Sequence, residues 1–262
     1  MRDWTDTTLC PGDVESKEPA LTIKDWYDMR GRMRSDRYDE DWRRAIDAFQ
    51  RRFTERFIRP VEAILERDMA GGIPEGRGFA VLALDCLLLE SLYGYRKGRH
   101  TKWGNTSEAF EKVLLEEPFQ TDFGRNDLAA RFGRAVRNGI LHDGETREGW
   151  IVWKSYRSGA PIVEERDGMT RIYRDEFHRA VRVYITAYFD RLRRDSAEAT
   201  ALRENFKCRV NELCDESAPP AAAASPTLLA RPTKVLATLG RTPVDDALAA
   251  FPERVAQTAP YE

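Results

Sequence analysis

Histidine, cysteine and long apolar runs are scarce in this chain of 262 residues, and each scarcity narrows its chemistry. Three histidines and four cysteines are present, and Cys10, Cys86, Cys208 and Cys214 are scattered without a CxxC pair. That spacing argues against a zinc site or a redox dithiol. No apolar run approaches the roughly 20 residues that span a bilayer, and the polar, acidic first residues are no signal sequence. We therefore expect a cytoplasmic, reduced protein without a metal, a cofactor or a membrane partner.

Net charge is also small. The 42 lysines and arginines nearly balance 44 acids, so the net charge is -2 although 33% of residues are charged. A protein that coats nucleic acid usually has a strong overall positive field, and this chain has none. Local basic patches are still compatible with the balance. The length suffices for a substantial core in one domain, or in one domain with appendages.

Apolar residues recur at three- and four-residue steps from residue 41 onward, which predicts helices. The first stripe, over 41–69, contains Pro60, which should kink or divide the helix. The strongest prediction is a helix over 77–97, because its centre is apolar nearly all round, as in a helix at the middle of a bundle. Further helices are expected from Thr106, from Asn126 to about Arg137, and over 175–194.

The pattern changes period between residues 149 and 173. Trp150–Trp153 and Pro161–Val163 flank a turn at Ser158-Gly159 and predict a β-hairpin. Asp167-Gly168 is a second turn signal, ahead of a third short strand around 171–173.

The predicted fold is mainly α, an antiparallel helical bundle over 41–216 with a small β-hairpin insertion at about 149–173. A lead-in over 1–40 precedes it, with one short helix near 22–33. A Pro- and Ala-rich tail over 217–262 follows, expected to be disordered apart from a short docking segment at 244–251.

One segment, Arg137-Asn138-Gly139-Ile140-Leu141-His142, combines groups that can cut RNA. A histidine can move protons near neutral pH, and a guanidinium holds phosphate oxygens through a planar fork of donors. Positions five apart on an uninterrupted helix lie about 140° apart, so Arg137 and His142 would diverge. Gly139 offers a break that brings both towards one cleft. A plain helix stop explains Gly139 equally well.

A helical bundle that carries this segment resembles the HEPN superfamily. The motif of that family is Arg, four to six residues and then His, and the residue after Arg is often Asn, Asp or His. Arg137, Asn138 and His142 fit it residue by residue, and the resemblance covers roughly residues 41–195. It implies a homodimer in which two motifs face each other across a cleft and act as a metal-independent endoribonuclease.

The resemblance also implies a mechanism. His142 would take the proton of a ribose 2′-hydroxyl or protonate the departing 5′-oxygen. Arg137 would grip the scissile phosphate, and Asn138 would orient the histidine or donate to a phosphate oxygen. RNA would be cut to 2′,3′-cyclic phosphate and 5′-hydroxyl ends, in a toxin or defence role with an antitoxin or another regulatory protein as partner.

Two acids and five basic residues are candidates for supporting this site. Asp85 and Glu90 lie in the apolar helix over 77–97. Either could position Arg137, with Glu90 the better candidate, or pair with another arginine and only fix helix packing. Basic residues could contact RNA, or simply form a solvated face and a basic helix terminus. These basic residues are Arg131, Arg134, Arg96, Lys97 and Arg99.

Two other functions are compatible with the same residues. A non-catalytic HEPN-like module would bind RNA or a nucleotide without cutting it. A helical protein-interaction domain would carry the motif by accident, with His142 satisfied beside Ile140-Leu141 and Arg137 a surface charge. The hairpin has three open roles: it caps the cleft, sets the choice of substrate or builds a dimer contact.

Overall fold

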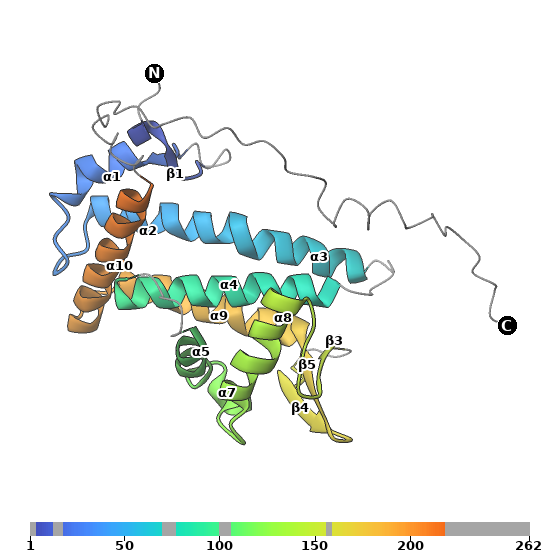
Figure 1. Ribbon diagram of the computed structural model, residues 1–262. Coiled ribbons are helices and arrows are strands. Elements are labelled where there is room, and N and C mark those ends of the chain that lie inside the picture. The colour runs from blue at the N-terminus through green and yellow to red at the C-terminus, as the bar shows by residue number, and fades with distance from the viewer. Residues whose placement is uncertain (1–3, 13–17, 70–76, 100–105, 156–158, 218–262) are drawn as a thin grey trace, which may run out of the picture. The chain divides into compact units, whose positions relative to one another are not determined.

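The computed structural model describes residues 4–12, 18–69, 77–99, 106–155 and 159–217 (Figure 1). Within these ranges the chain is mainly helical and has two small sheets. The predicted fold class is confirmed at this level. The predicted tail and its docking segment at 244–251 lie outside the described residues.

Helix α4 (Arg77–Lys97) has the bounds predicted from the sequence. It contacts the helices α3 (Arg59–Met69), α5 (Thr106–Leu114), α9 (Arg174–Leu192) and α10 (Ala197–Glu216), as Figure 1 shows. By length and composition alone α4 could cross a membrane. However, 56% of the apolar stretch that passes this test is buried inside the protein. It is the central helix of the bundle, as its all-round apolar sequence predicts.

The predicted helix over 41–69 is continuous through Pro60. It consists of α2 (Glu40–Phe53), a π turn η2 (Thr54–Ile58) and α3. Within η2 the Arg59 N–H bonds to the carbonyl of Thr54, five residues back. Proline has no N–H to donate and crowds the preceding turn, so we assign the wider turn next to Pro60 to this local conflict.

The described part of the lead-in packs into the same core as the bundle. It contains η1 (Trp4–Asp6), an antiparallel pair of β1 (Thr8–Cys10) and β2 (Leu21–Thr22), and α1 (Ile23–Arg30). The predicted short helix is therefore present. Trp26 of α1 is fully buried, and its indole N–H donates to Asn211 Oδ1 of α10 at 2.9 Å. These residues complete the core and are no separate appendage.

The larger sheet has the strand order β3-β5-β4, with β3 (Trp150–Trp153), β4 (Val163–Arg166) and β5 (Met169–Tyr173). Its hairpin joins β4 to β5 through Asp167-Gly168, whose φ angles are 55° and 75°. Two positive φ angles give a type I′ turn, which suits a two-residue hairpin loop. Strand β3 pairs with β5 in parallel, so the predicted hairpin between the first two strands is wrong.

An aromatic cluster joins this sheet to the helices. After α6 (Gln120–Phe123) comes α7 (Leu128–Phe132). The Phe132 ring stacks on Phe177 of α9 at 5.2 Å between centroids, and meets the Trp150 ring edge-on at 5.9 Å. Rings packed in this way contribute beyond the area that they bury, so α7 is firmly placed between α9 and the sheet.

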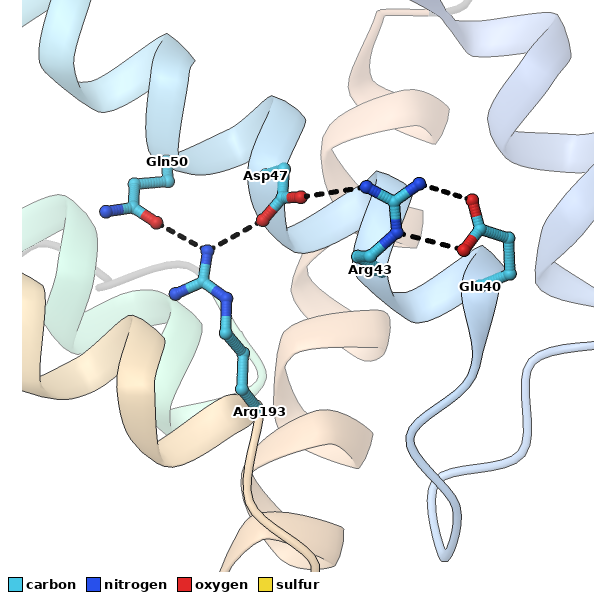
Figure 2. A network of polar contacts seen from close by, with 5 residues as sticks. All are labelled: Glu40, Arg43, Asp47, Gln50 and Arg193. Atoms are coloured by element: carbon cyan, nitrogen blue, oxygen red, sulfur yellow. Dashed lines mark hydrogen bonds and ion pairs between the residues drawn. The ribbon is translucent and has the colours of Figure 1, made fainter.

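A surface network holds the end of α9 to α2 (Figure 2). The guanidinium of Arg193, just beyond α9, donates to Asp47 Oδ1 at 2.7 Å and to Gln50 Oε1 at 2.6 Å. Arg43 then links Asp47, at 3.7 Å, to Glu40. Because these side chains are partly or fully exposed to solvent, we assign them to anchoring and expect each pair to contribute little stability.

Candidate functional site

The Arg137–His142 segment lies on one continuous helical stretch. It consists of α7, a second π turn η3 (Gly133–Arg137) and α8 (Asn138–Asp143). The helix passes through Gly139 without interruption and ends at Gly144, whose φ of 73° forms a left-handed cap. The predicted break at Gly139 is therefore wrong. The irregularity is η3, which ends at Arg137, and π turns are frequent at functional sites.

Gly139 serves close packing. A Cβ atom built on it would lie 2.3 Å from the carbonyl oxygen of Glu145. The chain after α8 folds back here: the Glu145 N–H donates to the Gly139 carbonyl at 3.3 Å, and the Arg147 N–H to the Ala135 carbonyl at 2.9 Å. Only a residue without a side chain permits this return, which leads directly into β3.

Gly139→Ala is expected to destabilise the protein by about 1–3 kcal/mol, because the new methyl group would push backbone away from backbone. Urea unfolding measures the change. The matched control is Gly31→Ala, since Gly31 has a φ of -68° and nothing within 4 Å of its Cβ position. The control should be neutral, or stabilising by up to about 1 kcal/mol. Equal effects at the two glycines would contradict the packing role of Gly139.

Arg137 is held at two points in a mostly buried position. Its Nη2 donates to Glu90 Oε2 on α4 at 2.6 Å, and its Nη1 donates to Asn138 Oδ1 at 2.9 Å. The side chains of Arg137 and Glu90 are 13% and 21% exposed. The partner of Arg137 is thus Glu90, the acid that the sequence favoured for this site. The guanidinium is fixed in place and still reaches the surface.

His142 lies apart from this cluster. Its side chain is exposed near the end of α8, and within the described residues it makes no hydrogen bond, ion pair or ring contact. Because α8 is uninterrupted, Arg137 and His142 are about 140° apart around the helix axis. A single chain therefore does not bring the two principal candidates together.

Asp85 pairs with a histidine to which the sequence interpretation gave no role. Asp85 Oδ1 lies 2.9 Å from His178 Nδ1 of α9, and both side chains are buried. The other atoms of the pair, Asp85 Oδ2 and His178 Nε2, are buried without a partner in the described structure. Burial raises the pKa of the Asp85 carboxyl, and the hydrogen bond with His178 opposes that shift.

One signal could have located this pair. His178 follows the apolar Phe177 and is followed by Val181, Tyr184 and Ile185, all on the buried face of the helix predicted over 175–194. A histidine on that face needs a polar partner. Asp85, the acid inside the predicted central helix, was the natural candidate for that partner.

Two of the five basic candidates already bond to other residues of the fold. Arg131 donates to Glu165 Oε1 at 2.9 Å and to Thr170 Oγ1 at 3.1 Å, and lies 5.8 Å from the Trp150 ring centroid. Arg96 bonds to the Tyr184 hydroxyl and to Glu116 Oε1, the latter at 3.0 Å. We therefore withdraw both as RNA contacts, because their guanidinium groups already have partners.

The other three basic candidates are more accessible. Arg134 is exposed and lies 3.9 Å from Glu148. Lys97 and Arg99 are exposed at the C-terminal end of α4, and the Lys97 ammonium lies 5.6 Å from the Tyr93 ring centroid. Seven residues of helix separate Lys97 from Glu90, which is roughly 10 Å along α4. Only Arg134 is on the same helical stretch as Arg137.

In the described part of the chain, no group of three or more histidine, cysteine, aspartate or glutamate side chains could hold a metal ion. No protein-family model, curated protein or solved structure matches this chain.

Proposed function

We propose that this chain is a metal-independent endoribonuclease in which Arg137 holds the scissile phosphate and His142 transfers the proton. The observation that carries the proposal is the two-point support of Arg137 by Glu90 and Asn138. A guanidinium that is already positioned stabilises developing negative charge without reorganising during the reaction. The HEPN resemblance supplies the substrate class, RNA.

The proposed reaction is a transesterification. The ribose 2′-oxygen attacks the adjacent phosphorus, while the imidazole of His142 accepts the 2′-hydroxyl proton. The bond from phosphorus to the 5′-oxygen breaks, that oxygen takes a proton from water, and His142 then releases the proton that it accepted to solvent. The products are a 2′,3′-cyclic phosphate and a 5′-hydroxyl. The exposed, unpaired imidazole of His142 suits this role, because no hydrogen bond must first be broken.

Asn138 has a narrower role in this proposal than the sequence suggested. Its amide oxygen accepts a hydrogen bond from Arg137, so it positions the arginine and does not orient the histidine. The amide nitrogen of the same side chain remains a donor for a phosphate oxygen. Asn138 thus links the guanidinium to the phosphate that both would contact.

The proposed site is completed by a second copy of the chain. Arg137 and His142 diverge on α8, so two motif helices that face each other would supply the missing group from the partner. An apolar strip on α4 supports an interface at this place. Leu87 is 42% exposed and lies one turn before Glu90, and Leu84 and Ala80 continue the strip. Within this proposal the enzyme acts in a cytoplasmic toxin or defence role and is restrained by a regulatory protein.

Labelled RNA incubated in chelator tests the proposal. Arg137→Ala should reduce cleavage by about 10²–10³-fold, as expected for loss of a charge-stabilising donor. Arg137→Lys should restore little, because an ammonium lacks the planar fork. The control is Arg32→Ala, which removes an exposed arginine that pairs with Asp41. Circular dichroism checks that each variant is folded, since Arg137→Ala leaves Glu90 unpaired.

The outcomes separate the three functions. Cleavage that Arg137→Ala abolishes supports the ribonuclease. RNA binding without cleavage by the wild type would instead indicate the non-catalytic module. A wild type that neither binds nor cuts RNA would leave the protein-interaction domain.

A further inference from the structure

The sheet β3-β5-β4 has one face in the core and one face outside it. Side chains alternate along each strand, and Trp150, Thr170 and Ile172 are buried on the inner face. The opposite face presents residues that do not belong to the core cluster. These are Ile151, Trp153, Met169, Arg171 and Tyr173.

Two aromatic side chains are paired on the outer face. In the parallel register Trp153 lies opposite Tyr173, on strands that are about 4.8 Å apart. Each has intermediate exposure. The Arg171 guanidinium lies 5.0 Å from the Trp153 ring centroid, and the Tyr173 hydroxyl donates to Glu164 Oε2 at 2.6 Å. The rings are therefore fixed in position by neighbours on all three strands.

The chemistry of this row matches an unpaired nucleic-acid base. Proteins bind single-stranded RNA by stacking bases on aromatic rings and on arginine planes, while basic groups meet the phosphates. Lys154 follows Trp153 directly, and its ammonium donates to a backbone carbonyl, that of Asp68, at 3.2 Å. Arg171 has an acid, Asp167, at 3.9 Å, and Glu164 lies opposite it in the antiparallel register. The charge of its guanidinium is thus partly balanced by acids, and the group stays beside the Trp153 ring.

The sheet is also attached rigidly to the motif helix. Arg131 of α7 donates to Glu165 on β4 and to Thr170 on β5, and the Arg147 N–H of the chain entering β3 bonds to Ala135 in η3. Figure 1 shows the sheet beside α7 and α8. A strand bound on the sheet would be held at a fixed position relative to Arg137.

We propose that the outer face of this sheet is a binding platform for single-stranded RNA, on which unpaired bases stack against Trp153 and Tyr173 next to Arg171. The choice of RNA as the occupant rests on the proposed function. Of the three roles considered for the hairpin, the platform corresponds to the choice of substrate: it would select single-stranded RNA.

Fluorescence anisotropy with a labelled single-stranded RNA tests the platform, using the full chain with His142→Ala so that the RNA stays intact. Adding Trp153→Ala or Tyr173→Ala should weaken binding about tenfold each, the effect of losing one stacked base. Trp153→Phe and Tyr173→Phe keep a ring and should bind nearly as well as the parent. Val183→Ala, which trims an exposed apolar side chain of α9, should bind like the parent.

Three results would overturn the platform. They are unchanged affinity in both alanine variants, equal affinity of the parent for a duplex of the same sequence, and a Trp153→Ala variant that changes only the oligomeric state on size exclusion. Failure of the platform and failure of the proposed function are distinguishable. If only the platform is wrong, the wild type still cuts RNA in chelator. If only the proposed function is wrong, the His142→Ala chain still binds RNA through Trp153, although the wild type cuts nothing.

Discussion

His142→Ala is expected to reduce RNA cleavage by about 10²–10⁴-fold, the usual contribution of a positioned acid or base, without lowering the unfolding midpoint. The side chain is exposed and makes no hydrogen bond, ion pair or ring contact within the described residues, so its removal should cost little packing. Cleavage in chelator and thermal unfolding are measured on the same preparation. The effect should fall on the catalytic rate, because His142 has no part in holding the phosphate.

The matched control for His142→Ala is Glu145→Ala, another exposed side chain just beyond the end of α8. It should cut RNA at the wild-type rate and unfold at the same temperature. A His142→Ala variant that retains cleavage would remove the histidine from the mechanism. A variant that loses both activity and several degrees of stability would show that His142 has a structural role instead.

Asp85→Leu is expected to lower the free energy of unfolding by about 3–5 kcal/mol, because it leaves the buried His178 without the one hydrogen-bond partner that it has among the described residues. Asp85→Asn keeps an oxygen for the imidazole and should cost much less. The double variant Asp85→Leu with His178→Leu should be less destabilised than the two single changes added together, since no buried polar group is then left alone. Urea unfolding of all four variants measures these differences.

The same pair predicts a dependence on pH. Burial, the larger effect, raises the pKa of Asp85 above its ordinary value, and His178 lowers it in part. A group with a raised pKa in the folded protein stabilises the fold below the unfolded value and loses that contribution as pH rises through the raised value. Unfolding free energy of the wild type should therefore fall, relative to Asp85→Asn, as pH rises from about 4. Parallel curves would contradict the raised pKa of Asp85.

Local patterns were sufficient to predict the helices. The bounds of α4 and its place at the centre of the bundle were evident from its apolar sequence, and the short helix α1 lies within the range 22–33 predicted for it. The choice of Glu90 as the acid near Arg137 also followed from simple chemistry, because a carboxylate in an apolar helix needs a charged partner. Such features depend on residues close in sequence or on one strong pairing preference.

Features that depend on distant contacts were not predictable in this way. Gly139 looks like a helix stop, but its role is set by the backbone of Glu145, which folds back onto it. Strand β3 pairs with β5 in parallel, a pairing that no turn residue signals. His178 is paired with Asp85, which lies 93 residues earlier in the chain. In each case the partner is fixed by tertiary packing.

The central claim is that Arg137 and His142 cut RNA through the 2′-hydroxyl, and the ends of the cleaved RNA test it most directly. RNA digested in chelator by the wild type should carry 2′,3′-cyclic phosphate and 5′-hydroxyl ends, and RNA with 2′-deoxy sugars at the cut positions should stay intact. Both His142→Ala and Arg137→Ala should give no such ends above background. Products with 3′-hydroxyl and 5′-phosphate ends, or cyclic ends that persist in both variants, would contradict the account.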